Sequence, residues 1–241
     1  MSTGRFFFRN RSKLYCAKVS AGNLNVSTRN PLTLTFDDSE WIPATTNFVF
    51  AYDADRISIV ATNIGLRLPV PEGKTWTMNH RVTGPGGLAN DGEGTLVLGA
   101  NAVGYEGATV AGENATVDLG GNGLPVRIGG AGTFTNGTVA NGGVALEIDD
   151  AGAAVEVPTV ASDVTFSGTV RVLAGRTSET PLSEPYATFD VLKYEGSAPD
   201  VSAFRLRGTG VSGLRGKFAV DAVRQVVVCT PEKHGFILEV R

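Results

Sequence analysis

The chain has 241 residues and a formal net charge of −3; 42% of its residues are hydrophobic, 19% are charged and 31 are glycine. This composition excludes global disorder, and the small net charge gives no reason to expect nucleic acid as a partner. No stretch reaches the ~20 consecutive apolar residues of a transmembrane helix, so we expect no transmembrane segment.

The charges are unevenly distributed. Residues 1–36 carry six basic side chains and no acidic one, whereas residues 89–163 carry ten acidic side chains and a single basic one, Arg127. We interpret the basic end as a solvated terminus, with a docking surface for an acidic partner as the alternative. Opposite charges in the two regions could also attract between copies of the chain, which predicts a homo-oligomer or filament.

The two cysteines, Cys16 and Cys229, lie near opposite ends of the chain. In an elongated fold they would not approach to the ~5.5–6 Å Cα separation of a disulfide, so we expect two buried or idle thiols. A disulfide would need the ends of the chain to meet or would form between molecules. The apolar triplet Phe6-Phe7-Phe8 is shorter than the ~7–15-residue core of a secretory signal, and we identify no such signal.

Apolar residues alternate with polar ones almost from end to end, which predicts a series of short strands. The alternating sets, in chain order, are Leu24/Val26, Leu32/Leu34/Phe36, Phe48/Phe50, Ile57/Ile59, Leu66/Leu68, Trp76/Met78, Leu96/Leu98, Val117/Leu119, Val126/Ile128, Leu146/Ile148, Val155/Val157, Val164/Phe166 and Val170/Val172. Between them lie clusters of Gly, Asn, Asp, Pro and Ser, which favour turns. No segment of helix length has a 3.6-residue apolar period, so the sequence predicts an all-β protein.

The spacing of these strands favours a solenoid over a sandwich or a barrel. Leu98 and Leu119 are 21 residues apart, and Ile128 and Ile148 are 20 apart, close to one coil of a parallel β-helix. We therefore predict a right-handed parallel β-helix, or β-solenoid, in which stacked coils bury a continuous apolar column.

One segment also resembles a known family. Residues 84–101 read Gly-Pro-Gly-Gly-Leu-Ala-Asn-Asp-Gly-Glu-Gly-Thr-Leu-Val-Leu-Gly-Ala-Asn, which is similar to the autotransporter-associated β-strand repeat. The resemblance is best over residues 73–120 and looser over residues 121–175. The segment Asn101-Ala-Val-Gly-Tyr-Glu-Gly107 departs from the Asn-Thr-Tyr-Thr-Gly usual in that family. The resemblance implies a secreted or surface-exposed bacterial β-helix that acts as a scaffold and has no catalytic residues.

Composition and strand pattern divide the chain into three parts. We expect N-terminal strands and first coils over residues 1–72, the solenoid repeats over residues 73–175, and a β-rich C-terminal cap over residues 176–241. A polar, proline-bearing connector over residues 177–185 introduces the cap, which is expected to cover the last coil and to end in a strand at Phe236–Val240.

Carboxylate pairs are the first candidates for catalysis or calcium binding. They are Asp37-Asp38, Asp53/Asp55 and Asp149-Asp150. Adjacent carboxylates on a strand point to opposite faces, whereas Asp53 and Asp55 could share one and bind calcium. We interpret all three pairs as aspartates that cap turns.

Other catalytic and cofactor signals are weak. The two histidines, His80 and His234, have no nucleophile motif or metal-ligand spacing beside them, and we expect ordinary surface or strand residues. The runs Gly84-Pro-Gly-Gly87 and Gly129-Gly-Ala-Gly132 lack the Gly-Lys-Ser/Thr of a phosphate-binding loop, so we expect corners of coils. The sequence therefore assigns no catalytic, cofactor-binding or metal-binding residue.

The function expected from these observations is that of a non-enzymatic structural or adhesive protein. We expect it at the cell surface or in the extracellular space, in contact with glycans or other cell-surface molecules. We also expect it to assemble into a fibre or a surface layer. Two alternatives stay open: a β-helical polysaccharide lyase or hydrolase, and a β-helix of the viral tail-fibre kind.

Overall fold

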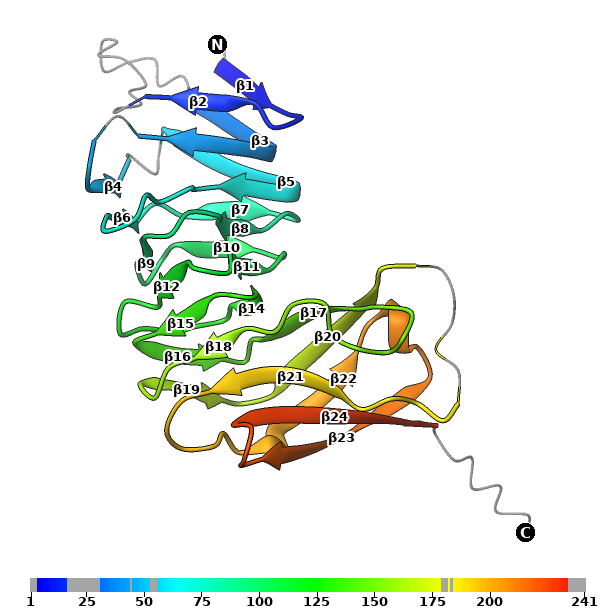
Figure 1. Cartoon of the computed structure of the whole chain (residues 1–241). Coiled ribbons are helices and arrows are strands. Elements are labelled where there is room, and N and C mark those ends of the chain that lie inside the picture. The colour runs from blue at the N-terminus through cyan, green and yellow to red at the C-terminus, as the bar shows by residue number, and fades with distance from the viewer. Residues whose placement is uncertain are drawn as a thin grey trace.

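The computed structural model describes residues 4–16, 31–43, 45–52, 56–178, 182 and 184–233. These residues form strands and two three-residue 3-10 helices, η1 (Val201–Ala203) and η2 (Thr209–Val211). The all-β prediction is confirmed. The strands are stacked along one axis, with the N-terminal strands at one end and β23 and β24 at the other (Figure 1).

Three sheets run along this stack. The first contains β1 (Gly4–Phe8), β2 (Lys13–Tyr15), β3 (Leu32–Ile42), β5 (Ile57–Arg67), β7 (Val82–Gly84), β8 (Leu88–Asn90), β10 (Val103–Tyr105), β11 (Thr109–Ala111), β14 (Arg127–Gly130), β17 (Gly143–Ile148), β20 (Val170–Arg176) and β22 (Phe204–Arg207). The second contains β4 (Phe48–Phe50), β6 (Thr75–Met78), β9 (Thr95–Leu98), β12 (Thr116–Asp118), β15 (Thr133–Thr135), β18 (Thr159–Val160), β21 (Phe189–Tyr194), β24 (Val226–Lys233) and β23 (Leu214–Asp221). The third contains β13 (Gly123–Leu124), β16 (Gly137–Ala140) and β19 (Val164–Ser167).

The chain visits the first and second sheets in turn, and we call each such passage a layer. Strand β8 pairs in parallel with β11, and β9 pairs in parallel with β12. The partners Leu88 and Thr109, like Thr95 and Thr116, are 21 residues apart. Long parallel sheets built in this way are consistent with the expected β-solenoid.

The layers are less uniform than the sequence spacing predicts. Ile128 pairs with Val144, only 16 residues later, and Ile148 pairs with Arg176, so the predicted match of Ile128 with Ile148 is wrong. Alternate residues of β17 are buried, and a shift by an even number of residues keeps the same face inward. The apolar alternation therefore predicts which face of β17 is buried, but not which residues of the neighbouring strands pair with it.

Other predicted strands differ in outcome. Val155 and Val157 lie outside every strand, and Val155 is 55% exposed. The expected strands at Leu24/Val26 and at Phe236–Val240 fall outside the described residues. The expected boundaries at 72/73 and 175/176 stay predictions; parallel pairing continues on both sides of each, through β5 with β8 and β18 with β21.

The buried column changes character along the stack. In the N-terminal layers it is aromatic: the ring of Trp41 stacks on Phe36 at 5.7 Å between centroids and on Tyr52 at 5.6 Å, and meets Phe50 edge-on at 5.1 Å. The middle layers are filled by aliphatic side chains such as Leu96 and Val117, both fully buried. Aromatic rings return at the C-terminal end, where Phe204 contacts Phe166 and Phe218.

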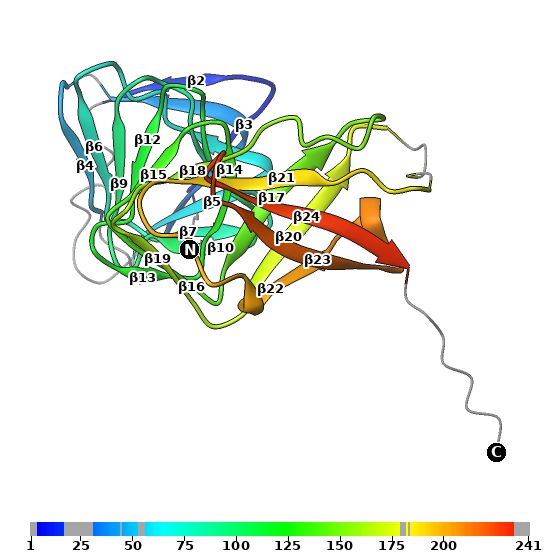
Figure 2. The same cartoon turned by 60° about the horizontal axis from the view of Figure 1, so that its bottom comes forward.

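The C-terminal end of the stack is crossed by an antiparallel hairpin. Strand β24 pairs antiparallel with both β21 and β23, whereas β21 itself pairs in parallel with β18. Figure 2 turns this end forward and shows β23 and β24 lying across it. The hairpin fills the place that the sequence assigns to a cap.

Glycines allow neighbouring layers to approach closely at one corner. A Cβ on Gly65 would lie 2.0 Å from the carbonyl oxygen of Gly87, and a Cβ on Gly87 would lie 2.2 Å from that of Ala108. Both distances are far shorter than any real carbon–oxygen contact. The run at residues 84–87 thus lies at a corner between β7 and β8, as expected.

We predict that Gly87→Ala destabilises the protein, because the added methyl group meets backbone, which cannot rotate away. The expected loss is about 1–3 kcal/mol of the free energy of unfolding, measured by urea denaturation. Gly123→Ala is the matched control, since the nearest atom to its new Cβ, that of Ala140, is 3.7 Å away. Equal stability of the two variants would contradict the proposed close contact.

Candidate functional site

The carboxylates of Asp37 and Asp38 point to different partners. Asp37 Oδ2 accepts a hydrogen bond from Asn63 Nδ2 at 2.9 Å, and Asp38 Oδ1 accepts one from Arg67 Nε at 2.6 Å. Asp38 has a φ of 46°, a left-handed conformation that interrupts the pairing of β3 with β5. The pair therefore belongs to a bend in the sheet and does not converge on one reactive position.

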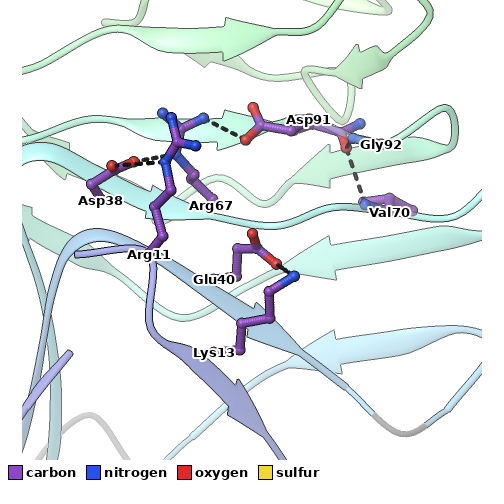
Figure 3. A network of polar contacts seen from close by, with 9 residues as sticks. Arg11, Lys13, Asp38, Glu40, Arg67, Val70, Asp91 and Gly92 are labelled. Carbon is purple, nitrogen blue, oxygen red and sulfur yellow. Dashed lines mark hydrogen bonds and ion pairs between the residues drawn. The ribbon is translucent and has the colours of Figure 1, made fainter. Parts of the chain in front are cut away.

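Arg67 lies at the centre of a network of charges that crosses layers (Figure 3). Its guanidinium contacts Asp38 of the preceding layer at 2.6 Å and Asp91 of the following layer at 2.5 Å. Arg11 joins the network through Asp38 at 3.6 Å, and Lys13 pairs with Glu40 at 2.9 Å beside it. The basic N-terminal residues of the described chain are thus partly neutralised by acidic residues of the adjacent layers.

This network holds layers together more than it offers reactive groups. Burial disfavours the charge on Arg67, but the hydrogen bonds that it donates to Asp91 and Asp38, together with the negative charges of these carboxylates, outweigh burial, so the pKa of the guanidinium is raised. The Arg11 side chain is 82% exposed. Exposed pairs of this kind contribute about 0–1 kcal/mol each, so we assign the network a modest stabilising role.

The residue before Asp91, Asn90, has a fully buried side-chain amide. Its Oδ1 accepts hydrogen bonds from the backbone N–H groups of Val70 and Gly92, both at 3.2 Å. Its Nδ2 donates to the carbonyl oxygens of Gly94 at 2.9 Å and Thr116 at 3.1 Å. One side chain therefore ties together backbone from three successive layers.

The second carboxylate pair also lies in a turn. Asp149 Oδ1 accepts from the N–H of Ala153 at 2.8 Å, as expected for an aspartate that caps a turn. Asp150 Oδ1 accepts from Arg176 Nη2 at 3.1 Å and from the Ser178 hydroxyl. The turn-capping interpretation is therefore confirmed for Asp149, whereas the Asp150 carboxylate binds side chains that follow β20 or end it.

The remaining candidates of the sequence divide into two groups. Asp53, Asp55 and His234 lie outside the described residues. His80 is not a surface or strand residue: it is 4% exposed, follows β6 in a bend, and its ring meets Tyr52 edge-on at 5.7 Å. Among the residues that the structure describes, no group of three or more His, Cys, Asp or Glu side chains could hold a metal ion.

A cavity that the sequence did not indicate lies near the end of β21. It measures about 370 Å³ and has both apolar and polar walls. Its polar lining residues are Glu195, Asp200, Ser162, Thr165, Ser197 and Tyr194. A backbone hydrogen bond from Ser202, with a second contact to its side chain, lowers the pKa of the Asp200 carboxyl. Asp200 is thus an anion that caps η1 and lines a cavity whose other walls include apolar side chains such as Val164 and Phe166.

This cavity was missed because its walls come from two layers. Glu195 and Asp200 lie five residues apart in the loop between β21 and η1, while Ser162 and Thr165 flank the start of β19. The only local signal is the acidic residue at each end of the segment Glu195-Gly-Ser-Ala-Pro-Asp200. Sequence spacing alone cannot show that this loop faces β19.

Neither Cys16 nor Cys229 forms a disulfide in the part of the chain that the structure describes. Cys229 is buried on β24, and this burial raises its pKa to about 12. Cys16 is partly exposed after β2, in the first layers of the stack. The two cysteines therefore differ in accessibility.

Comparisons with known proteins do not assign this site. The chain matches no protein-family model, no curated protein and no solved structure. Within the described ranges, none of the helices has the length and apolar character needed to cross a membrane.

We predict that Asn90→Ala lowers the free energy of unfolding by about 1–3 kcal/mol or more, because buried backbone groups lose their partners. Urea denaturation followed by circular dichroism measures the change. Asn114→Ala, an exposed residue of the turn before β12, is the control and should leave stability within about 0.5 kcal/mol of the parent protein. A small loss at both positions would argue against the cross-layer role of Asn90.

We predict that iodoacetamide at pH 8 labels Cys16 and leaves Cys229 unmodified in the folded protein, because the reactive species is the thiolate. Mass spectrometry of the peptides measures the labelling, and the same reaction in urea should modify both. Since the folded pKa of Cys229 lies above the ordinary value of 9.0, its ionisation should reduce stability only as the pH rises above about 9. Rapid labelling of Cys229 in the native state would contradict the burial described here.

Proposed function

We propose that this chain is a non-enzymatic structural or adhesive protein of the cell surface or extracellular space, built on a right-handed parallel β-helix. The parallel stacking of layers supports the solenoid, and the likeness of residues 73–120 to the autotransporter-associated repeat supports the surface location. The observation that carries the adhesive role is a column of threonines on the second sheet.

Five threonines occupy the same position in successive strands of that sheet. Thr75 pairs with Thr95, Thr95 with Thr116, Thr116 with Thr133, and Thr133 with Thr159. Each is followed by an inward-facing apolar residue, and none of the five is buried. Neighbouring strands are about 4.8 Å apart, so the column presents hydroxyl and methyl groups at a regular interval.

A surface of this kind suits a ligand that is itself repetitive. Threonine hydroxyls donate and accept hydrogen bonds, and their methyl groups pack against apolar faces, as the hydroxyls and C–H faces of a glycan require. Two residues further along their strands, Asp118 and Thr135 extend the polar surface on the same face. Extended contact without a deep cleft is the expected mode of a surface adhesin.

Glycan binding tests this role. We expect the protein to co-sediment with insoluble polysaccharides, screened as a panel, and the double variant Thr116→Val, Thr133→Val to bind about tenfold more weakly or worse, since two hydrogen bonds of about 1 kcal/mol each are lost. The matched control is Thr138→Val, Thr165→Val, which changes an in-register pair on the third sheet. If both double variants lose binding equally, or if the parent protein does not bind, the threonine column is not an adhesive surface.

Self-assembly needs a separate measurement. The basic residues 1–36 and the acidic residues 89–163 should attract between molecules at low ionic strength. Sedimentation velocity at micromolar concentration should then show oligomers that dissociate in about 0.5 M salt, where charges are screened. A monomer at low salt would contradict assembly, and a salt-resistant trimer would favour a protein of the viral tail-fibre kind.

The cavity beside β21 favours a second candidate, a polysaccharide lyase or hydrolase. Its two carboxylates, Glu195 and Asp200, are the residue type that glycosidases use as acid and base. This candidate predicts release of reducing ends or unsaturated products from a polysaccharide, and loss of that activity in Glu195→Gln and in Asp200→Asn. If both variants keep the full activity, this cavity is not the source of that activity.

A further inference from the structure

The last residue of β21, Tyr194, carries a hydroxyl group without a partner. The residue is 5% exposed and pairs with the inward-facing Val160 of β18, so its ring belongs to the buried column. Its hydroxyl forms no hydrogen bond with any residue that the structure describes, and its oxygen is not sealed from solvent. A buried tyrosine hydroxyl usually finds a partner. Tyr194 therefore holds a polar atom that the protein itself does not satisfy.

The open space beside Tyr194 is the cavity of about 370 Å³ between the loop after β21 and the start of β19 (Figure 1). Three more polar side chains of its lining have no hydrogen bond or ion pair within the described part of the chain: Glu195, Ser162 and Ser197. Of the other two, Asp200 Oδ1 accepts from the N–H of Ser202 at 2.9 Å. The Thr165 hydroxyl is bonded to that of Thr138 at 2.8 Å. The cavity thus keeps unused hydrogen-bond donors and acceptors.

The charge of the cavity is negative. Glu195 and Asp200 are acidic, and none of the lining residues is basic. Lys193, two residues before Glu195, does not line the cavity and forms no ion pair with Glu195. Within the described residues, the two carboxylates belong to no group of three or more His, Cys, Asp or Glu side chains that could hold a metal ion. The cavity therefore suits an organic cation better than a metal ion.

Part of the lining is apolar, and it includes Val164, Phe166 and Pro199. Ligand sites commonly combine an apolar surface with a few polar groups, in volumes of about 300–1,000 Å³. This cavity lies near the lower end of that range. Its occupant is therefore a small group, of the size of one sugar ring.

We propose that the cavity binds one residue of an amino sugar. The carboxylates of Glu195 and Asp200 hold its ammonium group, and the hydroxyls of Tyr194, Ser162 and Ser197 bond to its sugar hydroxyls. Hydrogen bonds between an ammonium and a carboxylate are about twice as strong as those between neutral groups. A simple alkylamine would satisfy the carboxylates and leave the three hydroxyls unused, so the combination favours a cation that also carries hydroxyl groups.

This site goes beyond the proposed adhesive function, because it does not use the threonine column of the second sheet. It also requires no bond cleavage, unlike the lyase or hydrolase considered for the same cavity. Binding of an amino sugar can therefore succeed or fail independently of both.

Exposed polar residues of a loop do not by themselves make a site. Glu195, Ser197 and Asp200 are exposed, and Asp200 already serves as the cap of η1. Tyr194 differs from them, because pairing with β18 fixes its backbone and the core surrounds its ring. A phenylalanine would fill the same place without an unpaired hydroxyl. The hydroxyl of Tyr194 is thus the observation that points to a ligand.

Isothermal titration calorimetry at pH 6, where amino groups are protonated, tests the site with three probes. They are a β-1,4-linked glucosamine trisaccharide, its N-acetylated counterpart and Nα-acetyl-lysine amide. The glucosamine trisaccharide should bind saturably, and the other two about tenfold more weakly or worse, because one lacks the charge and the other lacks the sugar hydroxyls. Equal binding of the N-acetylated trisaccharide overturns recognition of the ammonium group, and equal binding of the lysine derivative overturns recognition of a sugar.

The double variant Glu195→Gln, Asp200→Asn should bind the glucosamine trisaccharide about tenfold more weakly or worse. Asparagine is also a good cap, so η1 should be kept. The matched control is Glu93→Gln, Glu113→Gln, which removes the same charge from exposed residues between other strands and should bind as the parent does. Equal weakening in both double variants would mean that only net charge matters, and would overturn the site.

Tyr194→Phe separates binding from stability. Because the hydroxyl has no partner within the described protein, its removal should leave the urea midpoint unchanged, while the loss of one hydrogen bond to the sugar weakens binding about fivefold. Circular dichroism shows whether each variant is folded, and Glu195→Gln alone replaces the double variant if that one is not. Unchanged binding by Tyr194→Phe, or no saturable binding of the glucosamine trisaccharide by the parent, overturns the proposal. Release of reducing ends, measured in the same samples, tests the lyase or hydrolase separately.

Discussion

Parallel backbone pairing between successive layers determines where side chains of this protein can lie. Once Thr95 is paired with Thr116, Leu96 must stand above Val117 and Val97 above Asp118. One choice of register therefore fixes a buried row and an exposed row at the same time. The paired layers lie very close together at Gly65 and Gly87, where an added Cβ atom would overlap a carbonyl group of the next layer.

The pairing leaves polar groups at the corners, and side chains from neighbouring layers satisfy them. Asn90 does so inside the stack with four hydrogen bonds to backbone. Arg67 does so nearer the surface by joining carboxylates of the layers on either side. The inner contact matters more for stability, since a buried polar group without partners costs more free energy than an exposed ion pair contributes.

The two ends of the stack differ in structure. The N-terminal layers pack aromatic rings around Trp41, whereas the C-terminal end is crossed by the antiparallel strands β23 and β24. This hairpin leaves β22 as a free edge with arginines over it. The outer surface thus carries distinct chemistry at different heights: a threonine column on the second sheet, acidic residues in the middle, and arginines over the edge of β22 at the end.

The sequence by itself determined the all-β class, the inward face of most strands, the glycine corner near residue 87 and the turn-capping role of Asp149. These features depend on residues close together in the chain, such as the alternation Leu96/Leu98 and the turn that follows Asp149. Only the tertiary structure decided the pairing of Ile128 with Val144, the burial of His80 and the cavity of Glu195. The reason is physical: alternation has a period of two and tolerates even shifts of register, and contacts between layers depend on loop lengths that carry no apolar pattern.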